Sequence, residues 1–209
     1  MNTLKYILEK YNLRYDDKTP MPIEIPNVGR EQLTILFKEL GFKKGVEIGV
    51  LAGEYSELIC RNNPGVKLYG IDSYKAYCQH KSQRHLDRFY KKAKVLLAPY
   101  KKYQFIIESS KEAVNRFKNN SLDFVYIDGN HDFSSVMIDI ILWSEKIRSG
   151  GIISGHDYLN RREPTNHRVK QALIPYVKYN KIIPWFVLGL RVKKPGLIRD
   201  KERSWMWVK

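Results

Sequence analysis

Two short segments in the second half of the chain contain carboxylates and imidazoles close together. Residues 127–131 read IDGNH, with Asp128 and His131, and residues 154–158 read SGHDY, with His156 and Asp157. Two carboxylates and an imidazole that converge can bind a divalent cation, and oxygen-rich sites favour Mg²⁺ or Mn²⁺. We therefore predict a metal site made of Asp128, His156 and Asp157.

These residues also allow a site that needs no metal. His156 can act as a general base oriented by Asp157, or it can be a hydrogen-bonded histidine of the core. An imidazole among the ligands would also shift the preference towards softer cations. His131 is a second candidate base, although its position three residues after Asp128 also allows it to cap the next helix. The remaining histidines lie in polar stretches and are predicted to be surface residues: His80, His85 and His167.

A third segment, residues 47–56 (EIGVLAGEYS), combines an acid with two glycines four positions apart. Glycine allows the backbone to approach a ligand closely, because it has no Cβ. The dinucleotide fingerprint G-x-G-x-x-G is absent, since Leu51 stands where its second glycine would be. Glu47 would repel a pyrophosphate, and its carboxylate suits a ligand with a cationic group. The alternative is an ordinary tight turn of an α/β protein.

Asp72 follows nineteen residues after Gly53, at the end of the next apolar stretch. An acid at this place can accept hydrogen bonds from both hydroxyls of a ribose, as in nucleotide-binding α/β sheets. A helix N-cap is the alternative for Asp72 taken alone. Together with the preceding glycine segment, the ribose interpretation is favoured.

The elements that must position these residues are short strands that alternate with single helices. We expect strands near residues 46–50, 67–72, 103–108, 122–128, 152–157, 182–188 and 205–208, and helices near 3–12, 30–40, 54–60, 85–97, 110–117, 134–147 and 168–178. The proline-rich stretch 20–26 is expected to be irregular or extended. This alternation predicts an α/β fold with a mainly parallel sheet covered on both faces.

Ligands of such sheets bind beyond the carboxyl ends of the strands. The acids, hydroxyls and imidazoles described above follow directly after predicted strands, as do Glu108 and Ser109. Asp132 and Asp139 follow helical spacing, and we interpret them as a helix-start acid and as part of a solvated helix face. The sequence therefore predicts one site at the carboxyl edge of the sheet.

Composition limits the class of protein. The chain has 209 residues, of which 43% are hydrophobic, which is enough for a sizeable core and excludes a wholly disordered chain. Two cysteines, Cys60 and Cys78, cannot form a disulfide scaffold. No stretch reaches the ~20 apolar residues of a membrane span, and the N-terminus lacks the apolar region of a signal peptide. We expect a cytoplasmic protein without a membrane partner.

The charge balance is strongly basic, with 37 Lys and Arg against 22 Asp and Glu and a formal net charge of +15. Basic proteins accumulate on nucleic acids, so this class of partner has to be considered. However, the basic residues form runs without an Arg/Gly repeat or an RNP-like motif, and lysine runs are more often solvated helix faces. We favour a small-molecule acceptor, which can be anionic, over a nucleic acid; Arg161, Arg162 and Arg168 lie where acceptors approach such sheets.

The motifs resemble those of one enzyme superfamily. The pattern E-x-G-x-x-x-G at residues 47–53, followed by Asp72, resembles the class I S-adenosylmethionine-dependent methyltransferases. IDGNH and GGIISGHD (residues 150–157) are similar to a subgroup of that superfamily with I-D-G-x-H and G-G-x-I-x-x-H-D strand ends. The resemblance covers roughly residues 40–180.

The resemblance implies a three-layer, Rossmann-like sandwich with a mostly parallel seven-stranded sheet whose last strand is antiparallel. It implies an N-terminal helical cap at residues 1–40 and a methyltransferase domain at residues 41–209. It also implies S-adenosylmethionine as the cofactor. The residues that it places around the cofactor are Glu47, Gly49, Gly53, Ser56, Asp72, Ser73, Ser109 and Asp128.

These features predict a methyltransferase that methylates a hydroxyl of a small acceptor, such as a sugar or a sugar nucleotide. Asp128, His131 and His156 are the predicted catalytic residues. A metal would assist them as in the similar catechol-type O-methyltransferases, although His156-Asp157 replaces the acid and amide found there. The alternatives are a nucleic-acid methyltransferase and a nucleotide-binding relative without methyl transfer.

Overall fold

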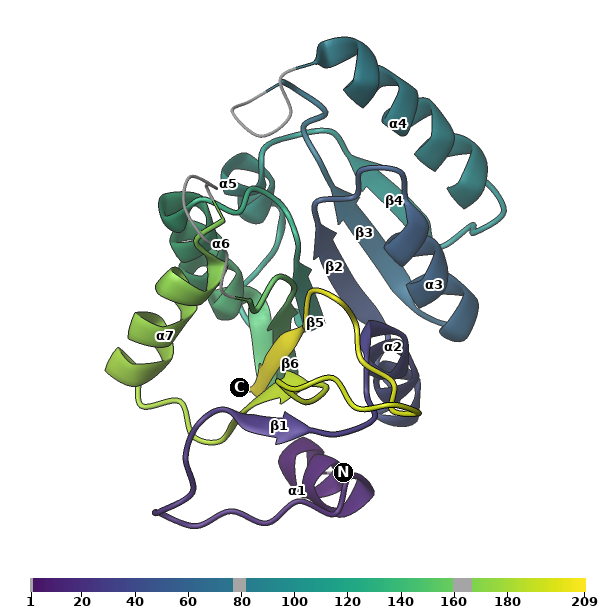
Figure 1. The fold of residues 1–209 in the computed structure, drawn as a ribbon. Coiled ribbons are helices and arrows are strands. Elements are labelled where there is room, and N and C mark those ends of the chain that lie inside the picture. The colour runs from purple at the N-terminus through teal and green to yellow at the C-terminus, as the bar shows by residue number, and fades with distance from the viewer. Residues whose placement is uncertain (1, 77–81, 160–166) are drawn as a thin grey trace.

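One sheet of eight strands lies at the centre of the computed structural model, which describes residues 2–76, 82–159 and 167–209 (Figure 1). The strands are β1 (Ile23–Ile25), β2 (Lys44–Ile48), β3 (Lys67–Ile71), β4 (Tyr103–Ile106), β5 (Leu122–Ile127), β6 (Ile147–Gly155), β7 (Trp185–Leu188) and β8 (Trp205–Val208). Their order is β1-β7-β8-β6-β5-β2-β3-β4. Neighbours are parallel except where β8 pairs with β6 and β7, so the predicted sheet with an antiparallel last strand is confirmed.

Helices cover both faces of this sheet and complete the predicted three layers. They are α1 (Thr3–Lys10), α2 (Arg30–Glu39), α3 (Glu54–Asn62), α4 (Gln83–Leu97), α5 (Ser110–Ala113), the 3₁₀ turn η1 (Val114–Arg116), α6 (Phe133–Lys146) and α7 (Val169–Tyr179). Helices α6 and α7 lie on the other side of the sheet from α2 and α3 (Figure 1). Side chains of α1, α2 and α3 belong to one core cluster, and those of α6 and α7 belong to the other.

Strand β5 shows why the apolar stretches become strands of this sheet. Phe124 and Tyr126 belong to the core under α2 and α3, whereas Val125 and Ile127 belong to the core under α6 and α7. All four side chains are buried. A parallel strand covered on both faces has no polar side, so it appears in the sequence as a continuous apolar run.

The sheet has one strand more than the seven expected. In the proline-rich segment, β1 pairs in parallel with β7, with Ile23 beside Phe186. Pro22 and Pro26 flank this strand. Proline is tolerated there because β1 is an edge strand, where a missing N–H costs little. Three residues are too few for an alternation pattern, which explains why the sequence did not predict β1.

The N-terminal segment shares a core with the rest of the chain. Ile7 of α1 and Phe37 of α2 are fully buried in the same cluster as Phe124 of β5. The Thr3 hydroxyl donates a hydrogen bond of 2.6 Å to the carbonyl of Gly150. The division into a helical cap (1–40) and a domain (41–209) stays a prediction. No helix in the described ranges is long and apolar enough to cross a membrane.

Candidate functional site

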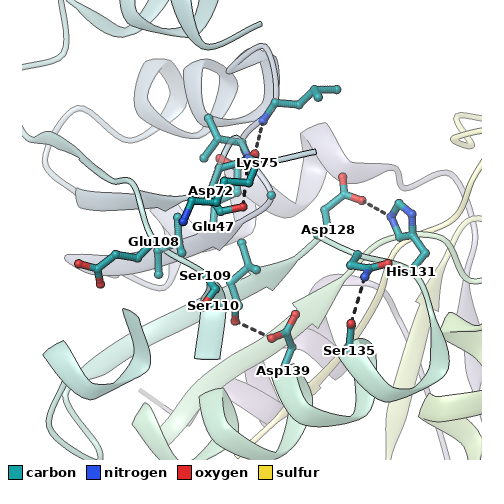
Figure 2. A pocket seen from close by; sticks show the side chains of 18 of the residues that line it. Glu47, Asp72, Lys75, Glu108, Ser109, Ser110, Asp128, His131, Ser135 and Asp139 are labelled. Carbon is teal, nitrogen blue, oxygen red and sulfur yellow. Dashed lines mark hydrogen bonds and ion pairs between the residues drawn. The ribbon is translucent and has the colours of Figure 1, made fainter. Parts of the chain in front are cut away.

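A cavity of about 530 Å³ opens at the carboxyl ends of β2, β3, β4 and β5 (Figure 2). The predicted site residues that line it are Glu47, Gly49, Asp72, Ser73, Ser109, Asp128 and His131. These residues come from four separate strand ends, and the parallel sheet places them on one edge. Gly53, Ser56, His156 and Asp157 lie outside the lining and are described below.

The glycine turn after β2 brings this strand end close to the end of β5. Gly49 has a φ of +88°, and a Cβ built on it would lie 2.1 Å from the carbonyl oxygen of Asp128. Gly53 has a φ of +82° and precedes α3. Both positions therefore need glycine for the backbone itself, and at Gly49 the close neighbour is the backbone of a predicted catalytic residue.

Asp72 holds the glycine turn by its carboxylate. Oδ2 accepts hydrogen bonds from the N–H groups of Val50 (3.1 Å) and Leu51 (3.0 Å), and Oδ1 accepts one from Tyr74 N–H (2.8 Å). Two carboxylate oxygens offer about four acceptor positions, so one remains for a ligand. To contact both ribose hydroxyls, Asp72 would have to give up one of its three hydrogen bonds from backbone N–H groups.

Glu47 is a buried acid that faces the cavity. Its side chain is 1% exposed and accepts a hydrogen bond from the Ser56 hydroxyl, which also contacts Tyr103 Oη at 3.2 Å. Burial raises the pKa of Glu47 to about 8. The structure thus places Ser56 behind Glu47, fully buried, where it orients that carboxylate.

Arg30 is a cavity residue that the sequence did not indicate. It lies at the start of α2, and its guanidinium carbon is 5.4 Å from the centroid of the Tyr55 ring. Within the described residues this guanidinium has no ion-pair or hydrogen-bond partner. It adds one positive charge to a cavity that also contains Glu47 and Asp128. No local pattern marks it, because only the tertiary fold brings α2 to the end of β2.

Asp139 of α6 also lines the cavity, and the prediction of a solvated helix face was wrong for it. The residue is 6% exposed and accepts a hydrogen bond of 2.5 Å from the Ser110 hydroxyl. Ser110 in turn accepts a bond of 2.7 Å from the indole N–H of Trp143. Burial raises the pKa of Asp139 to about 7. Asp132 caps α6 and accepts from Ser135 N–H, as its helix-start position predicted.

The predicted metal-binding residues form one cluster beside the cavity, at the ends of β5 and β6. His131 Nε2 is 3.4 Å from Asp128 Oδ1 and 3.0 Å from Asp157 Oδ2. His156 Nδ1 is 3.6 Å and 3.5 Å from the same two oxygens. Asp128 and His131 line the cavity as well, so they connect it to the cluster (Figure 2).

His167 joins this cluster, in contrast to its prediction as a surface residue. Its Nδ1 is 4.0 Å from Asp157 Oδ1, and its ring stacks on that of His131 with centroids 4.6 Å apart. The sequence gave no signal for this contact, because His167 precedes α7 and reaches the cluster only through the packing of α7 on α6. His85 is exposed, as predicted, and His80 lies outside the described residues.

The two carboxylates change the protonation of the imidazoles beside them. Burial lowers the pKa of His131 and of His156, but the neighbouring carboxylates outweigh it and raise these values to about 9 and about 10. In the same way the imidazoles hold the pKa of Asp157 well below its usual range. A group with a pKa two units above the pH is deprotonated in about 1% of molecules. Without a cation, both candidate bases are therefore protonated at neutral pH.

The donor set of the cluster fits a divalent cation. Asp128, His156 and Asp157 each offer one ligand atom, and these atoms lie within 4.8 Å of one another. Carboxylate and imidazole are both ligands of divalent metals, and both come from rigid strand ends.

Of the basic residues expected near the acceptor, Arg168 lies at the start of α7, whereas Arg161 and Arg162 lie outside the described residues.

Residues 46–158 match a family model described as a methyltransferase domain. None of the curated protein sequences compared with the chain matches it.

Several solved structures share the fold. An O-methyltransferase from Bacillus cereus in complex with SAH is 18% identical, with a TM-score of 0.58 over 99% of this chain and 90% of that one. The O-methyltransferase TomG from Streptomyces achromogenes in complex with SAM is 11% identical, with a TM-score of 0.60 over 86% and 78%. An rRNA methylase from Streptococcus thermophilus is 11% identical, with a TM-score of 0.55 over 80% and 87%. At these identities the likeness shows the fold.

Proposed function

Because this chain belongs to the family of methyltransferase domains, we propose that it transfers the methyl group of S-adenosylmethionine to a hydroxyl of a small acceptor. The observation that carries this proposal is the cavity at the carboxyl edge of the sheet. Its lining includes Asp128 and His131, which belong to an acid–imidazole cluster with His156 and Asp157. Its volume of about 530 Å³ is within the range of roughly 300–1,000 Å³ for small-molecule sites.

The charges of the cavity support binding of the methionine part of the cofactor. An amino-acid group has one ammonium and one carboxylate. Arg30 offers a positive charge to the carboxylate, and Glu47, whose pKa burial raises to about 8, would become a carboxylate beside the ammonium. We assign the carboxylate to Arg30 and the ammonium to Glu47. The acceptor position left on Asp72 suits one ribose hydroxyl. Ser73 and Ser109 continue the lining towards the expected place of the adenine.

Methyl transfer from a sulfonium is an in-line displacement. The acceptor oxygen forms a bond to the methyl carbon, the carbon–sulfur bond breaks, and its electron pair stays on sulfur. The acceptor hydroxyl gives up its proton. Holding the two reactants in line can lower the barrier by on the order of 7–11 kcal/mol, and this alignment is what a rigid strand edge supplies.

The cluster is the part of the site that would handle the proton. Asp128, His156 and Asp157 would hold a divalent cation, for which the sequence predicted Mg²⁺ or Mn²⁺, and a bound cation favours loss of a proton from a hydroxyl. Asp128 lies in both the cavity and the cluster, so an acceptor hydroxyl meets the cluster there. For His131 or His156 to accept a proton, its own proton must first leave.

The acceptor that we propose is a small hydroxylated molecule with an anionic group, such as a sugar nucleotide. Arg168 supports this choice, because its backbone N–H binds the carbonyl of His131 at 2.7 Å and so places a basic residue beside the cluster. The net charge of +15 also favours an anionic acceptor, since it attracts anions over a long range.

The experiment separates cofactor binding from methyl transfer. Titration calorimetry with S-adenosylhomocysteine should show one site per chain, and a panel of sugars and nucleotide sugars should be assayed with labelled S-adenosylmethionine. Asp72→Ala should weaken cofactor binding, whereas Asp157→Ala should retain it and abolish turnover. Absence of binding to the unmodified protein would refute the proposal. Equal loss of binding in both variants would refute the division of roles.

A further inference from the structure

Four possible donor atoms of the acid–imidazole cluster lie in contact with one another, and Asp157 belongs to both of the residue groups that could hold a metal ion. Each of two carboxylate oxygens, Asp128 Oδ1 and Asp157 Oδ2, faces both His131 Nε2 and His156 Nδ1. The four oxygen–nitrogen distances are 3.4, 3.0, 3.6 and 3.5 Å. The set contains His131, which was expected to be a base, together with the three predicted metal ligands.

Short hydrogen bonds account for one of these four contacts. Hydrogen bonds between nitrogen and oxygen have lengths of about 2.7–3.2 Å, and a contact of 3.6 Å is not one. Only the contact between His131 and Asp157 lies in that range. The other three contacts have the lengths of ion pairs.

The spacing agrees with the edges of a coordination polyhedron. Zinc binds imidazole nitrogen and carboxylate oxygen at about 2.0–2.2 Å, which gives edges of about 3.3–3.6 Å between the ligands of a tetrahedral site. The observed distances of 3.0–3.6 Å match these edges within a few tenths of an ångström. These are four of the six edges of a tetrahedron, namely those that join an imidazole nitrogen to a carboxylate oxygen.

We propose that His131 is a fourth metal ligand and that the centre selects a zinc-type divalent transition metal over Mg²⁺. The inference rests on the proposed function, whose metal site it deepens. Two imidazole nitrogens beside two carboxylate oxygens suit Zn²⁺ and Fe²⁺, whereas Mg²⁺ prefers an octahedral shell of oxygen atoms. A ligand role for His131 also removes it from the set of candidate bases.

His167 has a positioning role in this centre. Its ring stacks on the ring of His131 at an interplanar angle of 15°, and its Nδ1 faces the second oxygen of Asp157. It thus restrains one imidazole ligand and one carboxylate ligand. Residues that orient ligands in this way affect metal affinity by about 10–100-fold.

Metal affinity tests the proposal without an assay of methyl transfer. Zn²⁺ and Mg²⁺ are titrated against a fluorescent chelator with the full chain, its His131→Ala variant and the control His85→Ala, whose side chain is exposed on α4. We expect one Zn²⁺ per chain, Mg²⁺ weaker by at least about 100-fold, and a loss of at least tenfold in Zn²⁺ affinity with His131→Ala. His85→Ala should bind as the unmodified chain does. Equal affinity for Mg²⁺, unchanged Zn²⁺ affinity in His131→Ala, or no metal bound would overturn the proposal.

A spectroscopic measurement on the unmodified protein does not depend on the folding of a variant. Co²⁺ with four ligands absorbs visible light strongly, whereas six-coordinate Co²⁺ absorbs weakly. The proposal predicts the strong spectrum, and a weak spectrum would contradict it. Calorimetry with S-adenosylhomocysteine on the same preparation keeps the two proposals distinct. If the protein binds metal but not the cofactor, the proposed function is refuted and the metal centre is not. If it binds the cofactor but no metal, only the metal centre is refuted.

Discussion

Arg30 and Glu47 line the same cavity, and the role of Arg30 can be isolated by the choice of ligand. Arg30→Met should weaken S-adenosylhomocysteine binding by about 10–100-fold, because a charge-assisted hydrogen bond contributes about 1.5–3 kcal/mol. It should leave 5′-methylthioadenosine binding unchanged, since that ligand lacks the amino-acid group. Arg61→Met, at an exposed position on α3, is the matched control. If calorimetry shows equal losses for both ligands, Arg30 does not contact the carboxylate.

Glu47 should give the free protein a stability that depends on pH. Its pKa rises to about 8 on folding because the side chain is buried, so the folded chain keeps a proton that the unfolded chain releases above about pH 4.5. Stability from this group is therefore lost as the pH rises from about 4.5 to 8. Glu47→Gln removes the titration, and its stability relative to the unmodified chain should increase with pH, by on the order of 3 kcal/mol between pH 5.5 and pH 8.5.

Urea unfolding at pH 5.5 and pH 8.5 measures this difference directly. Glu9→Gln, on the exposed face of α1, should show no such trend and serves as the control. A stability difference between Glu47→Gln and the unmodified chain that is the same at both pH values would show that Glu47 ionises normally in the fold.

At the scale of the elements, the turn between β2 and α3 depends on the glycine at position 49. Gly49→Ala would combine a φ of +88° with a Cβ that lies 2.1 Å from the carbonyl oxygen of Asp128. Gly41→Ala has a comparable φ of +69° but nothing within 4 Å of its Cβ. The first variant should lose several kcal/mol of stability, and the second about 1 kcal/mol.

Thermal unfolding of these two variants separates backbone strain from steric contact. Cofactor binding should be lost in Gly49→Ala even where the protein remains folded, because the turn and Asp128 must move apart. Similar melting temperatures for both variants would mean that the ends of β2 and β5 are not in close contact.

On the scale of the whole molecule, the charge of +15 predicts weak and non-specific binding to RNA. Basic side chains lie exposed along α4: Arg84, Arg88, Lys91, Lys92 and Lys94. Affinity for random single-stranded RNA should fall steeply between 50 and 200 mM salt. Arg88→Ser with Lys91→Ser should reduce the slope of log K against log salt by about 1.4, since each phosphate contact contributes about 0.7.

Filter binding at a series of salt concentrations provides this slope. RNA should not displace S-adenosylhomocysteine, because Leu86 of α4 lines the cavity but the exposed basic residues of this helix do not. Tight binding that resists salt, or labelled methyl groups in the RNA, would favour a nucleic acid as the acceptor over a small molecule.

Much of the fold and half of the site could be predicted because their signals are local. Apolar runs such as that of β5 reflect burial on both faces, and an acid directly after such a run lies at the carboxyl edge of any parallel sheet. For this reason Glu47, Asp72 and Asp128 could be assigned to one site from their positions alone. The short edge strand β1 was missed because three residues carry no pattern.

The rest depended on contacts between elements that are distant in sequence. Arg30, Asp139 and His167 have ordinary local surroundings, and only the packing of α2, α6 and α7 brings them to the site. Hydrogen bonding and burial then set what each group can do: Asp72 is largely occupied by backbone N–H groups, and Asp139 is buried. Sequence alone determined the family, the sheet and the edge where chemistry occurs, since those follow from residue type and order. The tertiary structure decided the charge partners and donor distances, because these depend on positions in space that no local pattern encodes.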